Sequence, residues 1–152
     1  MGSIRAHGIS MGLSPGVEGR IIRRTAPPGA RAFPVVQAAS FPIPPHTGDF
    51  GTGAVEAMGP GDVFLTLVEV GPEHATTALY RHPRLPRALL PGEFSPTRMK
   101  RPLPGRCGGQ WFFTESGRPF NLYVVLGSFG ARRRLIPIAN QILRGITVEV
   151  AP

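Results

Sequence analysis

The chain has 152 residues, a formal net charge of +8 and a pI of about 11.4. Glycine and proline make up one residue in four, yet 41% of the residues are hydrophobic and nine are phenylalanine, which excludes a wholly disordered chain. The single cysteine, Cys107, excludes an internal disulfide framework and a cysteine-based zinc site, and no apolar run is long enough to span a membrane.

The length predicts one domain over residues 1–152. We expect a cytoplasmic location, because the lone thiol suits a reducing compartment and residues 1–19 hold no apolar run of signal-peptide length.

The N-terminal part of the chain predicts a β-hairpin. Apolar residues alternate with small ones over 9–13, which is typical of a strand. A Ser-Pro-Gly turn signal follows at 14–16. We therefore interpret residues 18–24 as the return strand of that hairpin.

Two further strands are predicted on either side of a glycine-rich loop. The first covers 34–41, and the loop covers 42–61 with a single helical turn over 53–58. The second strand covers 62–70 and is apolar on both of its faces. A strand of this kind belongs in the middle of a sheet, with both faces covered.

Residues 71–106 contain seven prolines, so regular strands and helices are not expected there. Polyproline-like extended stretches and turns are predicted instead. Because a free loop of this length is rare in a compact domain, we expect the segment to lie against the surface. Its expected anchors are apolar side chains, namely Leu85, Leu89, Leu90, Phe94 and Met99.

The C-terminal part predicts a second hairpin, formed by 110–115 and 120–127 with a turn at 116–119. An amphipathic helix follows over 135–144, with Pro137 in its first turn.

A start of this helix at Ala131 with a kink is the alternative, and Gly145 is the expected C-cap before a last strand over 146–150. The elements together predict an α+β fold. It consists of an antiparallel sheet of about five to seven strands, with the C-terminal helix packed on it and long loops rich in glycine and proline.

Four segments and the terminal helix and strand form a series along the chain: GISMGLSPGVEGRI (8–21), ASFPIP (39–44), GDFGTGAVEAMGPGDVFLTLVEVGPE (48–73) and FFTESGRPFNLYVVLG (112–127). The series resembles small proteins of unknown function from GC-rich Gram-positive bacteria, over most of the chain. Those proteins commonly have a Pro-Gly-Trp turn where this chain has Pro15-Gly16-Val17. The order of elements is also similar to the Mog1/PsbP-like α+β fold. Neither resemblance implies catalytic residues.

No catalytic motif is present, so we expect a protein that is not an enzyme. His46, Asp49, Glu56 and Asp62 lie in or beside the glycine-rich loop, where polar residues are common in any case, and we expect no metal or cofactor. Cys107 has a neighbouring arginine but no identifiable general base, so a structural role is preferred over a nucleophilic one.

The turn between the last hairpin and the helix is a candidate anion site. The first amides of a helix attract anions, and arginines would add positive charge. The candidate residues are Gly127, Gly130, Arg132 and Arg133. An ordinary strand-to-helix turn explains the same glycines and is the preferred interpretation.

The basic, proline-rich segment within 71–109 is the best-supported surface feature. Between Arg81 and Arg106 it carries seven basic residues against one acid. Arg81, Arg84 and Arg87 recur every three residues, which places them along one edge of a polyproline helix. The candidate partner-binding residues are Arg81, Arg84, Arg87, Arg98, Lys100, Arg101 and Arg106.

These observations predict a non-enzymatic binding or assembly module that contacts a protein partner, or a second copy of the chain, through the basic segment. Two alternatives stay open. One is nucleic-acid binding through the same arginines. The other is a small-molecule binder with a pocket between the last helix and the sheet.

Overall fold

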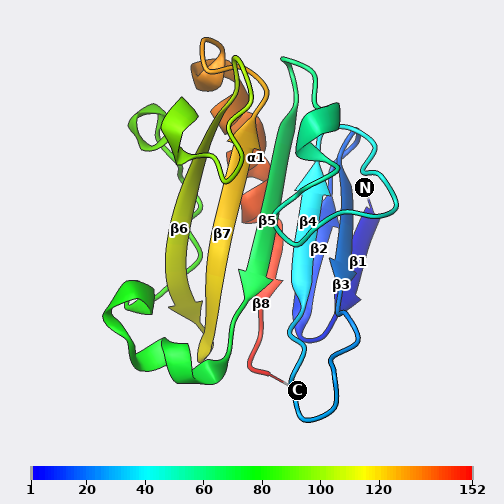
Figure 1. Ribbon diagram of the computed structural model, residues 1–152, viewed down its shortest axis with the longest axis vertical. Coiled ribbons are helices and arrows are strands. Elements are labelled where there is room, and N and C mark those ends of the chain that lie inside the picture. Colours follow the sequence, from blue (N-terminus) through cyan, green and yellow to red (C-terminus); the bar gives the residue numbers. More distant parts are fainter. Residues whose placement is uncertain (1, 152) are drawn as a thin grey trace.

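The computed structural model describes residues 2–151. It is an α+β fold with antiparallel sheets and one α-helix near the C-terminus, as predicted (Figure 1). In chain order its elements are β1 (Gly2–Ala6), β2 (Ile9–Leu13), β3 (Glu18–Ile22), β4 (Val35–Ala39), β5 (Val63–Glu69), β6 (Cys107–Glu115), β7 (Arg118–Leu126), α1 (Arg132–Arg144) and β8 (Ile146–Val148).

The eight strands form two sheets, where the sequence predicted a single sheet of about five to seven strands. The smaller sheet has the order β1-β2-β8 and the larger one the order β3-β4-β5-β7-β6. The apolar strand β5 lies in the middle of the larger sheet, which confirms the central position expected for it. Strands β3 and β6 form the two edges of that sheet.

The predicted hairpin between 9–13 and 18–24 is wrong in its pairing. β2 pairs with β1 and β8, whereas β3 pairs with β4. Gly19 shows how these two strands meet instead, because a Cβ at this position would lie 2.3 Å from Cε of Met11. β2 and β3 therefore pack closely against one another, with glycine making the room, and the turn between them carries the chain from one sheet to the other.

The first strand, β1, was not predicted. It pairs with β2 through a two-residue turn at His7 and Gly8, which have φ angles of 54° and 76°. Positive φ at both central residues is typical of a tight hairpin turn whose twist matches that of the strands.

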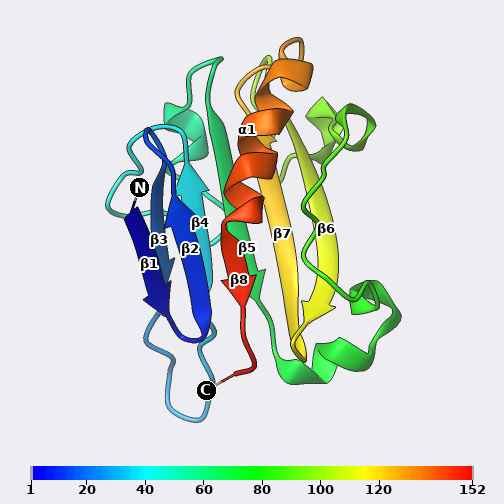
Figure 2. The same cartoon turned by 180° about the vertical axis from the view of Figure 1, so that it is seen from behind.

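The smaller sheet and α1 cover one face of the larger sheet, as Figure 2 shows. Alternate residues of β5 divide between the two faces. Leu65 and Leu67 join the core under α1, whereas Phe64 joins a second cluster on the opposite face. The loop between β4 and β5 covers this second cluster with side chains such as Val55 and Met58.

Helix α1 begins at Arg132, three residues before Leu135, so Pro137 is its sixth residue. Gly145 is the C-cap as predicted. Its φ of −84° is ordinary, and the need for glycine comes instead from close packing. A Cβ at Gly145 would lie 3.1 Å from the carbonyl oxygen of Gly12, which belongs to β2.

Residues 71–106, called the strap below, connect β5 to β6. Their regular structure consists of four short 3-10 turns, in agreement with the prediction for this proline-rich segment. Four of the five expected anchors, Leu85, Leu89, Phe94 and Met99, are buried. The prediction for the fifth, Leu90, is wrong, because this side chain is 62% exposed. Within residues 2–151, no helix has the length and apolar character that crossing a membrane requires.

Candidate functional site

Most of the basic residues of the strap fasten it to the rest of the protein. Arg87 donates from Nη1 to the carbonyl oxygen of Leu143 at 2.6 Å and from Nη2 to that of Ile146 at 2.8 Å. It thereby binds the end of α1, where unpaired carbonyls favour a cation. Arg106 donates to the carbonyl oxygen of Met58 at 2.8 Å, beneath the loop on the opposite face.

Three other basic residues also have partners within the chain. Arg98 donates to the carbonyl oxygen of Glu93 at 2.7 Å, and Arg101 forms an ion pair with Glu56 at 3.0 Å. The ammonium of Lys100 lies 4.3 Å from the centre of the Phe50 ring, which is a cation–π distance. Lys100 and Arg101 thus contact the loop between β4 and β5, whereas Arg98 binds within the strap itself. The basic side chains are engaged at different places and do not form one continuous basic edge.

Arg81 and Arg84 are the exposed exceptions. Within residues 2–151, neither side chain has a hydrogen-bond or ion-pair partner. The three-residue spacing predicted that Arg81, Arg84 and Arg87 share one edge. In the structure only Arg81 and Arg84 are free, whereas Arg87 is half-buried against α1.

Next to these arginines, strand β6 has an interrupted edge. At one end Gly108 exchanges two hydrogen bonds of 3.0 Å with Ser95 of the strap. At the other end the Thr114 amide donates to the carbonyl oxygen of His82 at 2.8 Å. Backbone groups alternate in direction along a strand, so the N–H and C=O groups of Gln110 and Phe112 point to the same edge. Within residues 2–151 they have no partner.

A groove of about 640 Å³ lies beside this unpaired stretch. The strap and β6 form its two walls, and Figure 2 shows the strap running alongside β6. Leu79 and Leu90 line it and are 58% and 62% exposed. Trp111 is held in the wall, because its Nε1 donates to Glu93 at 2.8 Å and its ring meets Phe94 edge-on at 5.5 Å. We call this feature the edge groove.

The edge groove contains residues that the sequence analysis did not single out. Residues 110–115 were expected to form a strand, but whether a strand lies at an edge depends on the order of strands in the sheet. No local signal in the sequence indicated the groove, and Leu90, which lines it, was expected to be a buried anchor.

At the candidate anion site before α1, several groups already bond within the turn, which agrees with the preferred interpretation as an ordinary turn. The amide of Gly127 donates to the carbonyl oxygen of Asp62 at 2.9 Å. The guanidinium of Arg132 lies 4.1 Å from the centre of the Phe129 ring and donates to that residue's carbonyl oxygen at 3.0 Å. Gly130 and Arg133 are exposed.

The three carboxylates near His46 have separate partners. Asp49 pairs with Arg24 at 2.6 Å, Glu56 pairs with Arg101, and Asp62 accepts from the Gly59 amide at 2.8 Å. Among residues 2–151, no three histidine, cysteine or acidic side chains are grouped so that they could hold a metal ion.

Cys107 is fully buried at the start of β6. Burial raises the pKa of its thiol to about 11, although the charge of Arg132 acts in the opposite direction. The thiol is therefore protonated at neutral pH and is a poor nucleophile.

The space between α1 and the larger sheet is filled by side chains. Leu135 and Ile142 are buried there, and Ile138 packs against the same cluster. The described part of the chain thus offers no room for the small-molecule pocket considered at this interface.

Comparisons of the chain with protein-family models, with curated proteins and with solved structures found no match. The resemblances noted from the sequence therefore stay predictions.

Proposed function

We propose that this protein is a binding module that takes up an extended segment of a partner protein along the open edge of β6. The unpaired N–H and C=O groups of Gln110 and Phe112 carry this proposal. An extended peptide laid along such an edge satisfies them and becomes an additional strand, which is a common mode of peptide recognition. Natural proteins usually cover or interrupt exposed edges, so an open stretch beside a groove favours a binding role.

The groove also indicates the chemistry of the segment. Its exposed leucines, Leu79 and Leu90, favour apolar side chains at alternate positions of the peptide. Arg84 lines the groove and Arg81 lies three residues before it, and neither charge is neutralised within residues 2–151. Charge complementarity therefore favours acidic residues flanking the apolar ones.

The roles of the strap residues differ under this proposal. Arg81 and Arg84 contact the partner, whereas Arg87 and Arg106 attach the strap to the rest of the protein and Arg98 braces it internally. A wall that is already fixed loses little conformational entropy when the peptide binds. We also propose a reducing compartment such as the cytoplasm, which suits a single cysteine without a disulfide partner.

The proposal is tested with peptides selected from a library of random ten-residue sequences displayed against the whole chain. We expect selected peptides to be apolar and acidic, and to protect the Gln110 and Phe112 amides from hydrogen exchange in NMR spectra. Gln110→Pro removes one outward N–H and is expected to weaken binding about three- to tenfold, since one hydrogen bond is lost.

Leu90→Asp tests the groove itself and is expected to weaken binding more strongly. Val150→Asp is the matched control, because Val150 is 73% exposed and does not line the groove. Selected peptides that protect other amides, or that bind Leu90→Asp and the parent chain equally well, contradict the proposal. Failure to select any peptide, or preferential binding of single-stranded DNA at this edge, also overturns it.

A further inference from the structure

Four arginines gather at the edge of the larger sheet opposite to β6. Arg20 lies in β3, Arg23 and Arg24 follow that strand, and Arg31 lies in the loop before β4. They line two hollows of about 460 and 530 Å³. Arg23 and Arg24 border both hollows, while Arg20 and His46 line the first and Arg31 the second. We call these four residues the arginine cluster.

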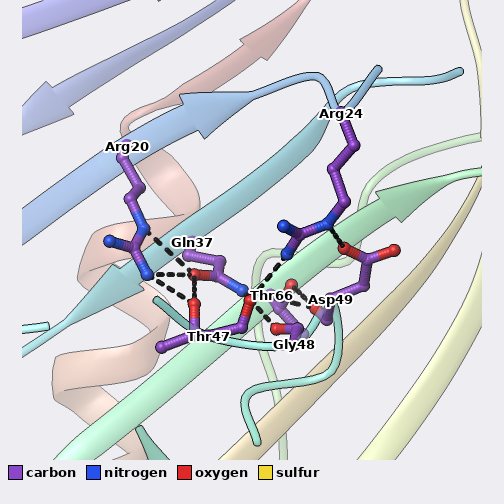
Figure 3. A network of polar contacts seen from close by, with 7 residues as sticks. All are labelled: Arg20, Arg24, Gln37, Thr47, Gly48, Asp49 and Thr66. Carbon is purple, nitrogen blue, oxygen red and sulfur yellow. Dashed lines mark hydrogen bonds and ion pairs between the residues drawn. The ribbon is translucent and has the colours of Figure 1, made fainter. Parts of the chain in front are cut away.

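Two members of the cluster are held in fixed positions, as Figure 3 shows. Arg20 donates to Oε1 of Gln37 at 3.0 and 3.2 Å and also to the hydroxyl of Thr47. Arg24 donates from Nε to Asp49 at 2.6 Å and from Nη2 to the carbonyl oxygen of Thr47 at 2.6 Å. The two guanidinium groups thus reach the same short segment of the loop between β4 and β5.

Buried polar side chains hold that segment from beneath. Gln37 and Thr66 are fully buried in β4 and β5. Gln37 donates to the carbonyl oxygen of Gly48 at 2.8 Å, and the Thr66 hydroxyl donates to that of Asp49 at 2.6 Å (Figure 3). The support for the arginines is therefore part of the sheet, and their positions are set before any ligand arrives.

The positive charge of the cluster exceeds what its neighbours neutralise. Asp49 pairs with Arg24, and no acidic residue of the described chain lines either hollow. Within residues 2–151, Arg23 has no hydrogen-bond or ion-pair partner, and the guanidinium of Arg31 lies 5.0 Å from the centre of the Phe33 ring. Burial, and then the nearby charge of Arg24, lowers the pKa of Arg20.

We propose that the arginine cluster binds the diphosphate group of a small molecule. Guanidinium groups bind phosphate oxygens in pairs, and several of them converge here on concave surfaces rather than along an extended stripe. Because the two hollows share Arg23 and Arg24, two linked phosphate groups can occupy them side by side. A compact anion therefore fits the cluster better than a long nucleic acid does.

The proposal is tested by titrating the whole chain with inorganic phosphate, pyrophosphate and ADP in a calorimeter, at constant ionic strength near 0.15 M. We expect pyrophosphate or ADP to bind at least about tenfold more tightly than phosphate. Tighter binding of ADP than of pyrophosphate identifies a nucleotide as the source of the diphosphate. Equal binding of the two identifies the diphosphate group alone as the determinant.

Arg23→Gln is the decisive variant, because the exposed side chain has no partner whose loss would unfold the protein. We expect it to weaken pyrophosphate binding at least about tenfold, as loss of a charged hydrogen bond does. Arg144→Gln removes the same charge from an exposed site at the end of α1, outside both hollows, and is expected to bind as the parent does.

Equal weakening by Arg23→Gln and Arg144→Gln would indicate attraction by net charge alone and overturn the proposal. So would equal affinity for sulfate and pyrophosphate, or binding of a single-stranded oligonucleotide without binding of pyrophosphate. The site is independent of the edge groove, since β3 and β6 are opposite edges of the sheet, so either proposal can fail alone.

Discussion

At the residue scale, Cys107 links stability to alkaline pH. The thiol has a pKa of about 11 in the folded protein because it is buried, compared with 9.0 for an ordinary cysteine. As pH rises above 9, the unfolded chain loses this proton before the folded one does. The free energy of unfolding therefore falls between pH 9 and 11, by up to about 2–3 kcal/mol from this group.

The prediction is checked by urea unfolding of the parent and of Cys107→Ala at pH values from 8 to 10.5. Tyr80 and Tyr123 also have raised pKa values through burial, so the parent is compared with the variant rather than with a constant baseline. We expect the alanine variant to be less stable at pH 8 and to lose less stability on the way to pH 10.5. Parallel curves for the two proteins contradict the prediction.

Arg118 is a second residue whose buried side chain is important for stability, because it makes several contacts. It pairs with Glu69 at 2.6 Å, where both side chains are less than 10% exposed, and it also donates to the carbonyl oxygens of His7 and Glu149 at 3.0 Å. It thereby joins the β1–β2 turn and the end of β8 to the larger sheet. We expect Arg118→Met to lower the free energy of unfolding by about 3–5 kcal/mol, because Glu69 is left buried and unpaired.

Denaturant unfolding measures this loss, and the double variant Arg118→Met/Glu69→Gln serves as its control. Removing the unpaired charge is expected to restore part of the stability. If the double variant is no more stable than Arg118→Met alone, the buried charge is not the cause of the loss.

At the element scale, the strap is held by contacts to α1 and β6. The Leu89 amide donates to Asn140 of α1 and the Leu85 amide to Glu115 of β6, at 2.8 and 2.9 Å. Arg87 adds one hydrogen bond to Leu143 at the end of α1 and one to Ile146 at the start of β8. We expect Arg87→Met to cost about 1.5–3 kcal/mol, and to speed hydrogen exchange at Leu85 and Leu89 more than in the middle of α1.

Arg81→Met is the control for this variant, because Arg81 is exposed and lies in the same segment without a partner among the described residues. It is expected to leave exchange at Leu85 and Leu89 unchanged. Equal effects of the two variants on hydrogen exchange would indicate that basic charge, and not the hydrogen bonds of Arg87, keeps the strap in place.

The elements themselves were predictable where the pattern of side chains is local. Alternation predicted β2, an uninterrupted run that is apolar on both faces predicted β5, and the i, i+3, i+4 pattern predicted α1. β1 was missed because its residues do not alternate clearly in polarity, and because a His-Gly turn is a weak hairpin signal. The preferred helix start at Leu135 is three residues late, since Pro137 was expected to lie in the first turn, whereas the alternative start at Ala131 is one residue early.

At the scale of the whole molecule, pairing and site geometry depend on residues far apart in the sequence. The division into two sheets brings Gly19 against Met11, a contact that no local pattern reveals. Both candidate sites arise in the same way. The edge groove needs β6 to be an edge strand, and the arginine cluster needs Gln37 and Asp49 brought beside Arg20 and Arg24. The sequence indicated basic charge but not which arginines remain free.

One of the two hydrophobic clusters connects the two sheets and the helix. Met11 and Ile146 from the smaller sheet, Leu65 and Leu122 from the larger one, and Leu143 from α1 all belong to one buried cluster. We therefore expect the whole chain to unfold in one transition, with far-ultraviolet circular dichroism and Trp111 fluorescence changing together.

Leu143→Ala tests this coupling at its centre, because the side chain is fully buried between α1 and the sheets. We expect it to lower the free energy of unfolding by about 2–5 kcal/mol, as creation of a core cavity does, and to shift both probes equally. Leu79→Ala is the control, since a leucine that is 58% exposed is expected to cost less than about 0.5 kcal/mol. If Leu143→Ala shifts the circular dichroism transition but not that of Trp111 on β6, the helix and the far edge of the sheet unfold separately, and the cluster does not couple them.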